Sequence, residues 1–429
     1  MQHHHRLAGV LGTAALAVAL SAAVVPAASA STAAPSTTMI RPHLGAAAAR
    51  IGANPTVAGR VAAIDAAAAT LPDVTTAYGV PDLWNAGITG AGTTVAVVDS
   101  FGDPNAAQVL DSYSQAHGLP PAELSVIAPA GPIPVCTPQL EQQIGCYDWI
   151  GETDLDITMV HAIAPEAHIV IAATPVNETE GFTGLPEMMT AIDYMAKHHI
   201  ADVISLSFGT PEDDFPTLDS PKQLDYAFRD AKAAGIPVVA ATGDCGATDN
   251  TNASTTQCGA VFPYRVTSWP GSDSLVTAVG GSVLHLNSSG LQASPATLWP
   301  DSGAGLSKTY ARPSWQNGVA SITRSTQRSL PDIAMQGVEG TSQATPLFGA
   351  VLALATQLHG GPLGFINPAL YQLGPKGAKA GVVDITTGND TQYGVPGFGA
   401  GKGFDIASGW GTVDPKAFVP ALVKQLDKQ

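Results

Sequence analysis

The sequence predicts an α/β fold in which a mostly parallel central sheet is covered by helices on both faces. Two observations support this prediction. Short apolar runs rich in β-branched residues recur along the chain, and such runs are typical of strands buried on both faces. Helix-compatible stretches lie between them, so strands and helices alternate, which implies right-handed crossovers. Active sites in sheets of this kind gather at the carboxyl ends of the strands.

The pattern places four strands and five helices over most of the chain. The strands are expected at residues 93–99, 168–173, 202–207 and 236–241. The helices are expected at roughly residues 105–117, 153–163, 185–198, 221–234 and 342–359. Asp99, Phe208 and Asp244 lie at or just beyond strand ends, which is where this fold class carries its chemistry.

The N-terminal stretch has the pattern of a secretory signal peptide over residues 1–30. Polar residues carrying His and Arg are followed by an apolar run at residues 7–25 and by the small-residue cleavage pattern Ala28-Ser29-Ala30. An uncleaved membrane anchor is the alternative, but several Ala and Gly residues weaken the apolar run. We therefore expect a secreted, extracellular protein that leaves the membrane after cleavage.

The following stretch, residues 31–72, is rich in Ala, Ser, Thr and Pro and then weakly helical, without a strand pattern. It is expected to be a linker or short N-terminal extension to one large domain at residues 73–429.

Composition restricts the partners and the compartment. The chain of 429 residues has 19 basic and 35 acidic residues and a net charge of −16, so nucleic acid is excluded as a partner. Only 13% of the residues are charged, which suits a protein that must stay folded in acid. The four cysteines form two sequence-local couples. Of the three possible pairings we favour the local one, Cys136 with Cys146 and Cys245 with Cys258.

A candidate nucleophile lies in the motif Gly340-Thr341-Ser342, which leads directly into an apolar, helix-compatible run. This order places the Ser342 hydroxyl and backbone N–H at a helix N-terminus, where unpaired amides favour developing negative charge. An acyl-transfer serine suits such a position. The ordinary alternative is a helix N-cap without chemistry.

Three acids are candidates for the chemistry around that serine. Glu152 and Asp156 are four residues apart, so on a helix they share one face. Two carboxylates at such a short distance usually share a proton. Asp244 follows the strand at residues 236–241 in a Gly-Asp turn. A solvated helix face and a turn acid are the alternatives. His161 and His168 sit in no motif of a catalytic histidine and are expected to be structural.

Together these residues resemble the sedolisins, or serine-carboxyl peptidases, which have a subtilisin-like fold. In that family a Glu and an Asp four residues apart on one helix, a Ser in Gly-Thr-Ser and an Asp in a Gly-Asp turn form the site. The matching residues here are Glu152, Asp156, Ser342 and Asp244. The resemblance covers about residues 73–429 and includes Trp149, Ala162-Ile163-Ala164-Pro165 and Ile204-Ser205-Leu206-Ser207.

The resemblance implies a role for each residue. Glu152 is the general base for Ser342, Asp156 orients Glu152, and Asp244 lines the oxyanion hole beside the Ser342 amide. An aspartate can donate a hydrogen bond to an oxyanion only when it is protonated, and an unperturbed Asp has a pKa of about 3.9. The site should therefore work in acid.

The C-terminal region adds an implied metal. Two carboxylates and several glycines occur in residues 384–389 and 401–405, and hard oxygen ligands suit calcium, although a glycine-rich loop is the ordinary alternative. The family's calcium site implies one structural Ca²⁺. Its ligands would be the side chains of Asp384 and Asp405 and the carbonyl groups of Ile385, Gly401 and Gly403.

Two features depart from the family pattern. Only about forty residues separate Ala30 from the catalytic region, whereas sedolisins commonly carry a large propeptide. Phe208 and Asp99 stand where some members have a hydrogen-bonded Trp and Glu, and Phe208 cannot form that bond.

The leading hypothesis is a monomeric, secreted acid endopeptidase acting on polypeptides. One alternative is a subtilisin-type Ser-His-Asp peptidase, because residues 97–100 resemble the strand that carries the subtilisin aspartate. The sequence lacks a His-Gly-Thr-His motif, however, and has Asp244 where an oxyanion Asn is expected. The other alternative is an inactive binding protein on a peptidase scaffold.

Overall fold

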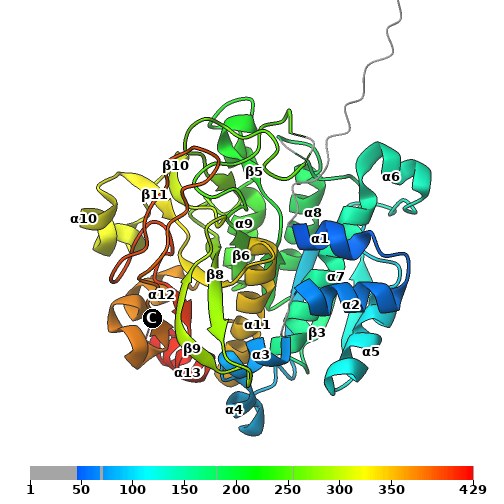
Figure 1. Cartoon of the computed structure of the whole chain (residues 1–429), viewed down its shortest axis with the longest axis horizontal. Coiled ribbons are helices and arrows are strands. Elements are labelled where there is room, and N and C mark those ends of the chain that lie inside the picture. Colours follow the sequence, from blue (N-terminus) through cyan, green and yellow to red (C-terminus); the bar gives the residue numbers. More distant parts are fainter. Residues whose placement is uncertain (1–45, 68–70, 180, 255, 429) are drawn as a thin grey trace, which may run out of the picture. The chain divides into compact units, whose positions relative to one another are not determined.

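The computed structural model of the chain describes residues 46–67, 71–179, 181–254 and 256–428. The expected signal peptide lies outside these residues. The described part is built on an eight-stranded sheet with the order β12-β8-β6-β4-β1-β3-β2, and β9 pairs with β8 outside that path (Figure 1). The strands are β1 Thr94–Ser100, β2 Glu123–Ile127, β3 His168–Thr174, β4 Val203–Leu206, β6 Val238–Ala241, β8 Thr277–Leu286, β9 Gln292–Leu298 and β12 Ile333–Gln336.

The four predicted strands are confirmed as the neighbours β1, β3, β4 and β6. All pairs along the path are parallel, and within this sheet the β8–β9 pair alone is antiparallel among the described strands. Val97 of β1, for example, is in register with Ile171 of β3 and with Ser205 of β4. These central strands form continuous apolar runs in the sequence because both of their faces are buried.

Helices cover both faces of the sheet, as predicted. Val95 and Val97 of β1 belong to the hydrophobic cluster that contains α11, whereas Ala96 and Val98 belong to the opposite cluster with α8 and α9. The larger helices are α5 Ala106–His117, α7 Cys146–Ile163, α8 Leu185–His198, α9 Tyr226–Ala233, α11 Thr341–His359, α12 Asn367–Leu373 and α13 Pro415–Leu426. The predicted helix at residues 221–234 is instead a short 3-10 turn, Pro221–Gln223, followed by α9.

Helix α7 begins seven residues before its predicted start at residue 153. The prediction was wrong because Gly151 looks like a helix boundary in the sequence, whereas it lies inside the helix at a close crossing with α1, Ala46–Gly52. A Cβ atom at Gly151 would lie 1.9 Å from the carbonyl oxygen of Ala48. The glycine is therefore a packing residue within the helix.

The described part of the expected N-terminal stretch contains α1 and α2 Val57–Ala67, and α3 Leu71–Ala77 begins at its end and runs into the predicted domain. Ile51 and Ile64 have no exposed surface, and α1 packs on α7. Residues 46–67 are therefore a packed part of the fold and not a free linker, because their apolar side chains complete the core beside α7.

The local cysteine pairing is confirmed, with Cys136 bonded to Cys146 and Cys245 bonded to Cys258. The first bond ties a loop to the start of α7, and the second closes the loop that follows Asp244. Within the described ranges, no helix has both the length and the hydrophobicity needed to cross a bilayer.

Candidate active site

Ser342 is the second residue of α11, where the unpaired amides of the first turn lie. The residue before the helix, Gly340, has φ 114° and ψ 156°, a backbone conformation that favours glycine. The Ser342 side chain is almost fully buried, and its Oγ lies 3.5 Å from the carbonyl oxygen of Ser207, just beyond β4. The turn therefore presents the hydroxyl at the carboxyl edge of the sheet.

Glu152 and Asp156 lie one turn apart on α7, and neither has any exposed surface. Asp156 Oδ1 accepts a hydrogen bond of 2.7 Å from Ser207 Oγ, which also lies 3.4 Å from the Ser342 carbonyl oxygen. Among the described residues, neither Glu152 oxygen nor Asp156 Oδ2 has a hydrogen-bond partner. Ser207 thus links one of the acids to the serine, while the other carboxylate oxygens are free for chemistry.

The electrostatics of this acid cluster favour protonated carboxyls. Burial raises the pKa of Glu152 well above its ordinary value, an interaction with the Ser342 side chain lowers it, and repulsion from Asp99 and Asp244 adds to the rise. Burial also raises the pKa of Asp156, with further repulsion from Asp99 and Glu152. The pKa of Asp99 is raised by burial to about 7. The cluster therefore holds protons in acid.

Asp244 contacts the turn that begins α11. Its Oδ1 accepts hydrogen bonds from the Thr341 backbone N–H at 2.7 Å and from Thr341 Oγ1 at 2.8 Å, and its Oδ2 accepts one of 3.1 Å from Gln257 Nε2. Burial raises the pKa of Asp244 to about 6, against the opposing effect of the Thr341 hydrogen bonds. The preceding Gly243 has φ 102°, so the sharp turn that aims Asp244 requires glycine.

The three predicted acids and the serine are therefore brought together. Ser342 and Asp244 line one small cavity of about 20 Å³, Asp156 is bonded to Ser207 in the wall of that cavity, and Glu152 lies within electrostatic reach of Ser342 and Asp244. Phe208 also lines the cavity, and Asp99 lies fully buried within electrostatic reach of Glu152. The sequence reasoning assigned no role in the site to Ser207, Gln257 or Asp249, all of which line this cavity. The position of Ser207 at the carboxyl end of a predicted strand was the signal that could have identified it.

Both mid-chain histidines have structural partners. His161 Nε2 lies 2.9 Å from Ser114 Oγ of α5, and burial lowers its pKa to about 4. His168 Nε2 lies 2.9 Å from Ser125 Oγ of β2. None of the described residues that line the cavity beside Ser342 is a histidine.

The predicted calcium ligands converge on one C-terminal loop. Asp384 Oδ2 accepts a hydrogen bond of 2.8 Å from the Gly403 N–H, and Asp405 Oδ2 accepts one of 2.7 Å from the Gly401 N–H. Asp384 Oδ1 is buried and has no partner among the described residues, while Ile385 is fully buried. Two carboxylates on one glycine-rich loop, with one free oxygen, fit a hard cation.

Comparison with known proteins identifies relatives for this arrangement. Residues 142–373 match the model of the subtilase family, Peptidase_S8. The chain is 30% identical to kumamolisin from Bacillus sp. (strain MN-32) over 79% of its own length and 61% of that protein. It is 27% identical to sedolisin from Pseudomonas sp. (strain 101) over 76% of its own length and 57% of that protein.

The fold also matches a solved structure. Pseudomonas sedolisin, a serine-carboxyl proteinase complexed with two molecules of pseudo-iodotyrostatin, superimposes with a TM-score of 0.67 at 25% identity. The match covers 82% of this chain and 97% of that one. The chain thus spans about three fifths of the curated relatives but nearly the whole of the structural one.

Proposed function

We propose that this chain, which belongs to the subtilase family and has sedolisins as its relatives, is an acid-acting serine-carboxyl peptidase that cleaves polypeptides through an acyl-enzyme on Ser342. The observation that carries the proposal is the meeting of Ser342 with three buried carboxyls whose pKa values are all raised. Perturbed acids beside a serine at a helix N-terminus are the parts that acyl transfer requires.

Glu152 is proposed as the general base. It takes the proton from the Ser342 hydroxyl as the oxygen attacks the carbonyl carbon, and it returns that proton to the departing amine. Asp156 accepts a hydrogen bond from the Ser207 hydroxyl, which fixes its side chain. Asp156 is proposed to stay protonated while Glu152 ionises, and to hold the Glu152 carboxyl in position. A protonated Asp156 leaves Glu152 free to ionise, since two adjacent buried carboxylates do not both carry charge.

Asp244 is proposed as an oxyanion-hole donor together with the Ser342 amide. With a pKa of about 6, its carboxyl is protonated below that pH and can donate to the developing oxyanion. As the pH rises through 6 the proton is lost, and the same group becomes a negative charge beside a forming negative charge. Activity should therefore be confined to acid.

The C-terminal loop is proposed to hold one structural Ca²⁺ through Asp384 and Asp405, with the carbonyl groups of Ile385, Gly401 and Gly403. The buried, unpartnered Asp384 Oδ1 supports this assignment. The ion would neutralise the buried Asp405 and the half-buried Asp384 and would fix the loop. We further propose that the protein is secreted and acts as a monomer, on the signal-peptide pattern of residues 1–30 and on the net charge.

The test is a pH–rate profile on a denatured protein substrate, with Ser342→Ala as the inactive control. We expect cleavage near pH 4 that disappears toward neutrality. Cleavage that peaks at neutral or alkaline pH and requires His161 would favour the Ser-His-Asp alternative. No cleavage at any pH would favour the inactive binding scaffold.

A further inference from the structure

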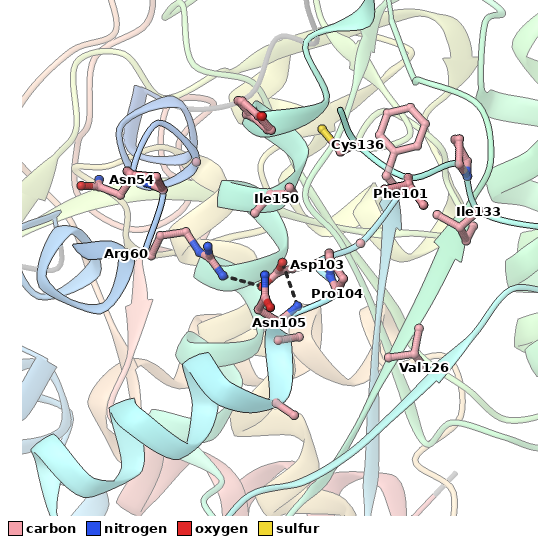
Figure 2. A pocket seen from close by; sticks show the side chains of 18 of the residues that line it. Asn54, Arg60, Phe101, Asp103, Pro104, Asn105, Val126, Ile133, Cys136 and Ile150 are labelled. Carbon is pink, nitrogen blue, oxygen red and sulfur yellow. Dashed lines mark hydrogen bonds and ion pairs between the residues drawn. The ribbon is translucent and has the colours of Figure 1, made fainter. Parts of the chain in front are cut away.

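A second, much larger cavity lies away from Ser342. Its volume is about 680 Å³, and its walls come from the end of α1, from α2, from the loop after β1, from β2 and the segment that follows it, and from the start of α7. Figure 2 shows Phe101, Ile133 and Val126 on one side and Asn54 and Arg60 on the other. The chemistry proposed above uses none of these residues.

The cavity lies at the same edge of the sheet as the candidate active site. Phe101 and Asp103 follow the carboxyl end of β1, while Ser207 and Gly243 follow the carboxyl ends of β4 and β6. Parallel strands bring these ends to one edge. Helix α7 also joins the two sites, since Ile150 lines the cavity and Glu152 is two residues further on.

Helix α1 borders both regions as well. Gly52 at its end lines the large cavity, while Arg50 lines a separate cavity of about 300 Å³ together with Asp244 and Gly340. Arg50 also forms an ion pair with Glu339, directly before the Gly340 turn. Helix α1 therefore borders both the large cavity and the smaller cavity beside Asp244.

The walls favour an extended apolar chain. Leu124 and Val126 are two residues apart on β2, so their side chains share one face of the strand, and Ile133 and Val135 repeat this spacing in the next segment. Val126 and Val135 are 56% and 78% exposed, although both are large apolar residues. Strand β2 ends the sheet, so one of its edges has no ladder partner among the described strands.

The cavity is held open by fixed contacts. In its wall the Arg60 guanidinium donates to Asp103 at 2.8 Å, and the Cys136–Cys146 bond ties the outer segment to α7. A preformed apolar site with a free strand edge suits an extended polypeptide, which can add to the edge and place alternate side chains in the cavity.

We propose that this cavity is a second binding site for the polypeptide substrate, which holds an extended apolar segment outside the segment that is cleaved. The inference rests on the proposed peptidase function for the identity of its ligand. Binding in this cavity lowers KM for long substrates. It does not change KM for a short peptide, because a peptide that fills only the surroundings of Ser342 does not reach the cavity.

The kinetic test compares Val126→Asp and Val135→Asp with wild type at pH 4, on a denatured protein and on a short peptide. Both side chains are exposed, so folding should be unaffected. We expect KM for the protein substrate to rise about tenfold in the double variant, on the scale of losing one buried valine, with kcat and the short-peptide kinetics unchanged. Leu291→Asp, at an exposed apolar residue outside the cavity, is the matched control and should change nothing.

A binding test separates this inference from catalysis. The Ser342→Ala protein is titrated with a fluorescent decapeptide that alternates Val and Thr, and Ala107→Trp is used to fill the cavity from its exposed rim. We expect saturable binding that the Trp variant and the double Asp variant both abolish, whether or not the wild type cleaves peptides. Unchanged binding in both variants overturns the proposal. An equal loss of activity on the short peptide also overturns it, because the cavity would then serve the fold. A wild-type dimer that the Asp variants dissociate overturns it too, because the cavity would then bind a second copy of the chain.

Discussion

Two buried acids on helix α7 have opposite surroundings, although they are two residues apart. Asp154 Oδ2 accepts a hydrogen bond of 2.6 Å from Arg60 Nε, and the same guanidinium donates to Asp103. Glu152 is equally buried, but it has no cation beside it among the described residues, and its neighbours Asp99 and Asp244 are acids. Burial and repulsion from Asp103 raise the pKa of Asp154 too, but Arg60 opposes that rise and ties the acid into the fold. No cation among the described residues opposes the rise at Glu152, so the acids around it hold protons.

This difference shows that one helix can carry an acid that stabilises the fold and, two residues away, an acid of the candidate active site. Arg60 of α2 forms ion pairs with Asp154 of α7 and with Asp103 of the loop after β1. These pairs tie α2, α7 and that loop together. Glu152 and Asp156 lie on another face of α7, and Glu152 lies beside the Ser342 side chain. We expect the two faces to respond differently to substitution, acid and metal removal.

The largest effect should come from exchanging each acid for its amide. Glu152→Gln should lower kcat by about two to four orders of magnitude, because it removes the proposed base, with little change in thermal stability. Asp154→Asn should keep turnover and lower the free energy of unfolding by about 3 kcal/mol, because Arg60 loses a buried partner. Turnover at pH 4 measures the loss of activity, and thermal unfolding measures the loss of stability. An active Glu152→Gln together with an inactive His161→Ala would reverse our assignment.

The next effect concerns stability against pH. The pKa of Asp99 is raised to about 7 in the fold, above its ordinary value near 4, so folding favours the protonated form. Its stabilising effect is therefore complete below about pH 4 and is lost as the pH rises to 7, by up to about 4 kcal/mol.

Calorimetry with a chelator present, so that no calcium effect opposes the trend, should accordingly show a higher melting temperature at pH 4 than at pH 7 and a smaller difference in Asp99→Asn. Asp219→Asn, at an exposed acid whose partner Lys222 stays charged over this range, is the control. A wild type that is more stable at neutral pH would contradict the raised pKa values of the cluster.

Asp244 tests the oxyanion role with a somewhat smaller effect. Asp244→Ala should lose about 3 kcal/mol of transition-state stabilisation, as for one oxyanion donor. Asp244→Asn donates at every pH, so its activity should fall less than that of the wild type as the pH rises through 6, and the ratio of kcat/KM values at pH 4 and pH 6.5 measures this. An Asn variant that is inactive at all pH values would place Asp244 within the proton network of Glu152. A fully active Ala variant would make it only a turn residue.

Calcium should give the smallest of these changes. A chelator at neutral pH should lower the melting temperature, since the ion adds about 2.7 kcal/mol when its concentration is a hundred times Kd. Acid should remove the benefit, because Asp384 and Asp405 bind the ion only when ionised. An equal chelator shift in Asp384→Ala would show that the ion binds elsewhere.

The sequence by itself determined the parts whose signals are local. The four central strands follow from apolar runs, the pairing of Cys245 with Cys258 from short spacing, and the shared face of Glu152 and Asp156 from one helical turn. The motif around Ser342 places a serine at a helix start, and the family resemblance joined these pieces into one candidate site.

Tertiary structure decided what depends on distant contacts. Arg60 reaches Asp154 across 94 residues, and Ser207 reaches Asp156 across 51, and neither pair leaves a periodic pattern in the chain. Gly151 lies just before the predicted helix start, yet it is inside α7 at the point where α1 crosses it. Such contacts form only after separate elements have packed, so their partners follow from the packing and not from local sequence.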